Sequence, residues 1–165
     1  MNKELGIMGS GFTLVELMLV MGLVAILSGF GISAAVKYSR AQNVDVSARN
    51  FANTLQTAKS RAFAGVRPTG CSGVLLDWRV NIAADYKHYS LSGNCSGGII
   101  NSPTVTLATG VEMTRPVDSV IYPVLKGSAT LGTAQLASPQ QIFFTSSSGL
   151  TRNVTVYDDA RISVH

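Results

Sequence analysis

The chain has 165 residues, of which 46% are hydrophobic and 13% are charged, and its formal net charge is +4 at pH 7. This length accommodates one membrane-spanning helix and one compact domain, and the modest charge lacks the clustered basic patch of a dedicated nucleic-acid-binding protein. The two cysteines and two histidines lack the spacing of a zinc site, and no acid, base or nucleophile pattern accompanies them. We therefore expect a protein that is not an enzyme and holds no metal or cofactor.

The N-terminal region combines a short motif with a long apolar run. The letters GFTLVEL occupy positions 11–17, and an almost uninterrupted apolar run continues to Val36. As a helix, residues 12–36 would rise roughly 37 Å, more than the ~30 Å of a bilayer's hydrocarbon core. An ionised carboxylate in such a run costs on the order of 2.5–3.5 kcal/mol, so Glu16 requires a counter-charge. Cleavage after Gly11 would create one, the amine of Phe12 on a neighbouring chain.

This motif closely resembles the processing site of type IV pilins and the related pseudopilins. The resemblance implies that residues 1–11 are a leader, and that a prepilin peptidase cuts after Gly11 and methylates the new amine of Phe12. It further implies that Glu16 pairs with that amine on another pilin or pseudopilin subunit during assembly. The resemblance also implies insertion in the cytoplasmic (inner) membrane, with an extracytoplasmic C-terminal domain. This orientation rests on the resemblance alone, since the Lys/Arg distribution does not favour it.

Other interpretations fit parts of the same motif. Thr13 and Glu16 have the spacing of a capping box, which is compatible with processing. A secretory signal peptide fits poorly, because its apolar region spans only about 7–15 residues and ends at a small-residue cleavage site. A plain membrane anchor that never polymerises remains as an alternative.

Residues 37–65 contain no proline and are predicted to continue the helix as an amphipathic segment. Apolar residues recur at alternating spacings of four and three and form one stripe that should pack against a globular domain: Val44, Ala48, Phe51, Leu55, Ala58 and Ala62. Glycines weaken the helix upstream of this segment. We therefore predict that Ser28–Gly31 is an extensible or melted stretch in an assembled filament.

Residues 66–165 are predicted to form a β-rich globular domain after a Gly- and Pro-rich break. The predicted strands are short and rich in Val, Ile, Thr and Tyr: Val74–Val80, Tyr86–Leu91, Thr104–Thr109, Ser119–Leu125, Gln140–Thr145, Arg152–Tyr157 and Arg161–Val164. Residues 91–102 and 126–139 are predicted as exposed loops, and Asp158-Asp159 as a hairpin turn. The expected fold class is α+β, with a long N-terminal helix, transmembrane in its first half, packed on an antiparallel sheet domain.

Residues 44–80 also resemble the H-type minor pseudopilins of type II secretion and the related fimbrial minor pilins, whose helix ends in a basic, alanine-rich turn before a strand. This resemblance implies a minor subunit of a type IV pilus or of a type II secretion pseudopilus. Some fimbrial relatives bind DNA through a C-terminal Gly-Arg-x-Arg segment, where this chain reads ARIS at positions 160–163. A DNA-binding minor pilin for DNA uptake is therefore the alternative function, with Arg152 and Arg161 as the candidate phosphate contacts.

The compartment that the resemblance implies also bears on Cys71 and Cys95. Outside the cytoplasm the two thiols would form a disulfide, and closing that loop contributes roughly 3–4 kcal/mol in the chain-entropy model. The alternative is a pair of reduced thiols in a β-domain. Given the inferred compartment, we expect the bridge.

Overall fold

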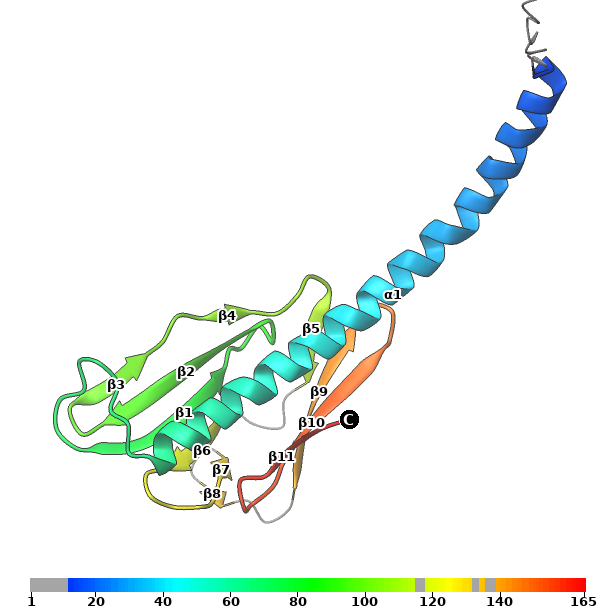
Figure 1. Cartoon of the computed structure of the whole chain (residues 1–165). Helices are drawn as coiled ribbons and strands as arrows, with labels where there is room; N and C mark the ends of the chain where they lie inside the picture. The colour runs from blue at the N-terminus through cyan, green and yellow to red at the C-terminus, as the bar shows by residue number, and fades with distance from the viewer. Residues whose placement is uncertain (1–11, 115–117, 132–133, 136–138) are drawn as a thin grey trace, which may run out of the picture. The chain divides into compact units, whose positions relative to one another are not determined.

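The computed structural model describes residues 12–114, 118–131, 134–135 and 139–165. In this part the chain forms one long helix, α1 (Leu14–Phe63), followed by antiparallel β-structure, so the predicted α+β fold class is confirmed (Figure 1). The chain divides into two compact units, one ending at Tyr38 and one beginning at Ser39.

The first unit contains the N-terminal part of α1. The Thr13 hydroxyl accepts a hydrogen bond from the Glu16 N–H at 3.2 Å, which satisfies one of the free donors at the helix start. The helix runs unbroken through Ser28–Gly31, where the Ser28 hydroxyl donates to the Val24 carbonyl at 2.7 Å. The melted stretch expected at 28–31 concerned an assembled filament and stays a prediction, because the isolated chain is helical there.

The second unit begins with the amphipathic part of α1, whose apolar face is buried. All six residues of the predicted stripe have exposed fractions of 0–1%. The Phe51 ring meets the Tyr89 ring edge-on, with centroids 5.1 Å apart, and lies 5.5 Å from the Phe144 ring. Because Tyr89 and Phe144 belong to different sheets, Phe51 ties the helix to both of them.

Among the described residues, the first sheet has seven strands in the order β3-β2-β1-β6-β7-β8, with β4 paired to β2. Trp78 and Val80 of β1 face the core beside Tyr122 and Val120 of β6. The seven strands are β1 (Leu75–Ile82), β2 (His88–Cys95), β3 (Gly98–Asn101), β4 (Val105–Thr106), β6 (Ser119–Pro123), β7 (Thr130–Leu131) and β8 (Ala134–Gln135).

The second sheet has four antiparallel strands in the order β11-β10-β9-β5. Its core-facing side chains include Ile142, Phe144, Val154 and Val156, all with exposed fractions of 0%. The predicted turn at Asp158-Asp159 is confirmed between the last two strands. The four strands are β5 (Val111–Thr114), β9 (Gln140–Ser146), β10 (Thr151–Val156) and β11 (Ile162–Val164).

Each predicted strand overlaps an observed one, but the two predicted loops are wrong in part. Residues 91–102 contain the end of β2 and all of β3, and residues 126–139 contain β7 and β8, while β5 was not predicted. The polar end of β2 is held by tertiary contacts rather than by its own composition. A side-chain atom on Gly93 would collide with the Pro68 ring, which lies only 2.7 Å from that position. The glycine therefore permits the preceding loop to pack directly on the strand.

That loop, residues 64–74, follows α1 and is fastened to the first sheet at several points. Cys71 and Cys95 are joined by a disulfide, with their Cα atoms 5.9 Å apart. The Trp78 indole N–H donates to the Val66 carbonyl at 2.8 Å, and the Arg61 guanidinium lies 5.1 Å from the centre of the same ring. These contacts satisfy a buried donor and place a cation over an aromatic face at the end of the helix.

Tyr122 has a buried polar atom that lacks a hydrogen-bond partner among the described residues. This atom is the hydroxyl oxygen, and burial raises the pKa of the phenol. A buried hydroxyl without a partner costs about 1–3 kcal/mol. We therefore expect Tyr122→Phe to raise the free energy of unfolding by about 1 kcal/mol in urea denaturation. Tyr89→Phe is the comparison, because the Tyr89 hydroxyl interacts with Thr54; a loss of stability in Tyr122→Phe would contradict the assignment.

Candidate functional site

The N-terminal part of α1 exposes apolar side chains that no part of the chain covers in the described residues. The helix contains a stretch long and apolar enough to cross a membrane, and none of that stretch is buried within the protein. Leu14 and Val15 are each 72% exposed, and Phe12 is 78% exposed. An apolar surface of this extent requires an apolar environment, either lipid or other helices.

Glu16 is the one charged residue between positions 12 and 36, and it lies in the first turn of α1. A carboxylate near a helix N-terminus interacts favourably with the free N–H groups there. In lipid that interaction would not compensate a full charge, and a carboxylate there would call for a cation close to the first turn. Phe12 lies one turn away along the chain, whereas Gly11 falls outside the described residues.

Of the two arginines predicted to contact DNA, Arg152 lies on β10 and Arg161 lies immediately before β11, and each faces a carboxylate. Arg152 Nε lies 3.4 Å from Asp45 on α1, and Arg161 pairs with Asp159 in the hairpin turn. A hydrogen bond from Arg161 lowers the pKa of Asp159. The positive charge of both arginines is thus partly neutralised within the chain, and contact with DNA stays a prediction.

Two hollows lie between α1 and β11, and they bring together residues that the sequence analysis did not connect. One, of about 490 Å³, is lined by residues that include Arg49, Gln56 and Arg152. The other, of about 450 Å³, is lined by residues that include Gln56, Lys59 and Arg161. Arg49 and Lys59 were missed as site residues because only the fold brings this face of α1 to the edge of β11. We name the two hollows together the α1–β11 groove.

Asp45 is the acidic side chain in this groove, and two arginines surround it. The Arg49 Nε donates to its carboxylate at 2.7 Å, and Arg152 approaches the other oxygen. The hydrogen bond from Arg49, together with the charges of both arginines, lowers the pKa of Asp45. The i,i+4 spacing of Asp45 and Arg49 is visible in the sequence, but the approach of Arg152 from β10 is not.

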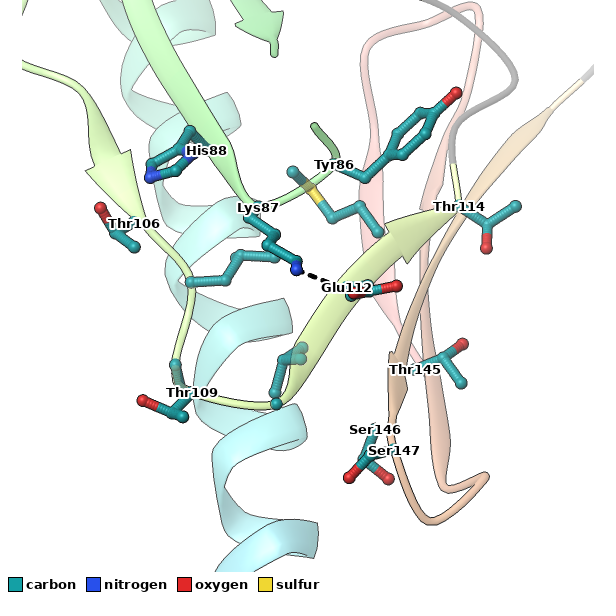
Figure 2. A pocket seen from close by; sticks show the side chains of 15 residues that line it. Tyr86, Lys87, His88, Thr106, Thr109, Glu112, Thr114, Thr145, Ser146 and Ser147 are labelled. Atoms are coloured by element: carbon teal, nitrogen blue, oxygen red, sulfur yellow. Dashed lines mark ion pairs between the residues drawn. The ribbon is translucent and has the colours of Figure 1, made fainter. Parts of the chain in front are cut away.

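A larger hollow of about 850 Å³ lies beside β5, and hydroxyl groups surround it. Figure 2 shows the Lys87 and Glu112 side chains reaching toward each other, and their charged atoms are 3.1 Å apart. His88 pairs with Asp85 close by. A hydrogen bond from the Lys87 N–H, assisted by His88, lowers the pKa of Asp85. Both ion pairs are exposed, and such pairs contribute little free energy.

The described residues contain no group of three or more His, Cys, Asp or Glu side chains positioned to hold a metal ion. No protein-family model, curated protein or solved structure matches this chain.

Proposed function

We propose that this protein is a structural subunit of a type IV pilus or of a type II secretion pseudopilus, inserted in the cytoplasmic membrane and assembled through its N-terminal helix. The observation that carries the proposal is a bare apolar helix with one carboxylate, Glu16, in its first turn. The motif at positions 11–17 supports it, because a peptidase that cuts after Gly11 would leave a free amine at Phe12.

The physical logic of assembly follows from the cost of burying charge. A lone carboxylate and a lone ammonium are each expensive in an apolar medium, and pairing them offsets much of that cost. Within one chain, the Phe12 amine precedes the helix by only a few residues, so each subunit carries both members of the pair. When helices from several subunits pack side by side, the amine of an incoming subunit meets Glu16 of its neighbour, and this contact also sets the axial register of the helices.

Mass spectrometry of the protein isolated from its host tests processing directly. The expected mature protein begins with N-methylated Phe12. If only chains that begin at Met1 are found, neither processing nor the amine–carboxylate pair exists, and the proposal fails.

Glu16→Ala tests the assembly step separately from processing. We expect normal cleavage after Gly11 but at least roughly tenfold less protein in sheared filaments, equivalent to about 1.4 kcal/mol or more of lost pairing. Quantitative immunoblotting of the filament and membrane fractions measures this ratio.

Two further variants make that result specific. Glu16→Gln keeps the side-chain shape without the charge and should also assemble poorly, whereas Glu112→Ala removes an exposed carboxylate of the second unit and should assemble normally. Normal incorporation of Glu16→Ala into filaments would contradict the proposed pairing of Glu16 with the Phe12 amine. A processed chain that never enters a filament would instead favour the non-polymerising anchor.

A further inference from the structure

The α1–β11 groove has a free strand edge along one side. In the described part of the chain, β11 pairs only with β10 and so ends the second sheet. The main-chain groups of Asn153 and His165 bond each other at 3.0 and 2.9 Å, and the Tyr157 N–H donates to the Arg161 carbonyl at 3.0 Å. Since antiparallel ladders alternate, the N–H and C=O groups of Ile162 and Val164 point away from β10.

These outward groups border the groove rather than the body of the domain. Ile162 lines one hollow and Val164 lines the other, and neither main-chain N–H donates a hydrogen bond to a described residue. An added strand would lie about 4.8 Å from β11, in the space between β11 and α1. All of the residues that form this space belong to the second unit.

The charges lining the groove indicate the chemistry of an occupant. Four cationic side chains line the groove, two from α1, one from β10 and one just before β11, and Asp45 and Asp159 pair with the arginines among them: Arg49, Lys59, Arg152 and Arg161. Val164 and Ile162 are paired with the core-facing Val154 and Val156, so their side chains lie on the helix side of the sheet. Alternate side chains of an added strand would therefore also lie on that side, near Arg49 and Lys59.

We propose that the α1–β11 groove binds an extended, acidic peptide segment of another protein by strand addition to β11. Main-chain hydrogen bonds to Ile162 and Val164 supply the docking, and carboxylates at alternate positions meet Arg49 and Lys59. A peptide fits the groove better than a nucleic acid, because an outward carbonyl accepts a hydrogen bond from a peptide N–H but not from a phosphate. This inference is independent of filament assembly, since no residue of the first unit takes part.

The test uses the full chain, labelled with ¹⁵N and held in detergent micelles, and follows its amide resonances by NMR. The probes are a peptide of alternating Glu and Val, a matched peptide of alternating Lys and Val, and a short DNA duplex. The glutamate peptide should shift the amide resonances of Ile162 and Val164, and its affinity should fall at least threefold between 50 and 300 mM salt. The lysine peptide should bind at least tenfold more weakly.

A pair of variants at one position separates strand addition from attraction by side chains. Val164→Pro removes an outward N–H without breaking a hydrogen bond to β10. It should lower the affinity for the glutamate peptide at least tenfold. Val164→Ala keeps that N–H and should change the affinity less than threefold. If Val164→Pro fails to fold, the double reversal Arg49→Glu/Lys59→Glu, at one exposed and one half-buried helix position, provides the test, with at least a tenfold loss of affinity expected.

Three results would overturn the proposal. The first is no shift with the glutamate peptide in either the native chain or Val164→Ala, and the second is unchanged affinity in Val164→Pro or in the charge reversal. The third is a shift of the Arg152 and Arg161 resonances with the duplex alone, which would assign the groove to nucleic acid.

Discussion

Phe51→Ala is expected to lower the free energy of unfolding by about 3–5 kcal/mol, the largest effect of any single substitution considered for this protein. The Phe51 side chain is fully buried and contacts Tyr89 of the first sheet and Phe144 of the second. Its removal would leave a cavity where three elements meet, and the two ring contacts are each worth about 0.5–1.5 kcal/mol beyond the area they bury.

The measurement is urea denaturation in detergent, followed by the fluorescence of Trp78, which is the sole tryptophan and is 2% exposed. Phe63→Ala is the matched control, because Phe63 ends the same helix but is 66% exposed. Its cost should stay below about 0.5 kcal/mol, as is usual for surface substitutions. Equal losses in the two variants would mean that the helix does not hold the sheets together through Phe51.

Loss of the Cys71–Cys95 disulfide is expected to cost about 3–4 kcal/mol of stability. The bridge closes a loop with a sequence separation of 24, and the chain-entropy model assigns this order of stabilisation to a loop of that length. Cys71 also belongs to the loop of residues 64–74, which carries the Val66 carbonyl that accepts the Trp78 indole hydrogen bond. Opening the bridge therefore releases one attachment of that loop to the first sheet, in addition to restoring the chain entropy of the unfolded state.

The double variant Cys71→Ala/Cys95→Ala tests this, because alanine avoids placing a new polar group at the buried Cys95 position. The urea midpoint of the native chain should fall on addition of a thiol reductant and should approach that of the double variant. The reductant should not move the midpoint of the double variant itself. An unchanged urea midpoint of the native chain in the presence of reductant, with the bridge verified as open, would contradict the expected stabilisation.

The helix is the part of the fold that the sequence specifies most completely. The apolar stripe from Val44 to Ala62 follows the helical period, and every one of its members is buried. The strands with β-branched and aromatic residues, such as 152–157, were also located within a few residues. In these segments the local preference and the tertiary packing agree, so either one identifies the element.

Strands whose stability comes from distant contacts could not be predicted in this way. The end of β2 reads Ser-Gly-Asn-Cys at positions 92–95, which is typical of a loop. It is extended because Pro68 packs on Gly93 and because Cys95 is tied to Cys71. The four residues of β5 alternate buried and exposed, but a segment this short gives too weak a period to detect.

The candidate site shows the same difference between features that a local pattern predicts and features that depend on distant contacts. The motif around Glu16 is continuous in sequence, so it can be recognised without the fold. The α1–β11 groove joins Arg49 and Lys59 to a strand about a hundred residues later, and no local pattern indicates that they meet. Arg152 was selected for its charge alone, and its approach to Asp45 depends on the pairing of β10 within its sheet.

The attachment of α1 to two sheets at once has a mechanical consequence. Because Phe51 contacts Tyr89 and Phe144 together, the helix cannot separate from one sheet at this point while it keeps its contact with the other. A tensile load applied along the axis of α1 would therefore act on the whole core in shear, where many contacts must yield at the same moment. Rupture under force should accordingly occur as one large event rather than as a series of small steps.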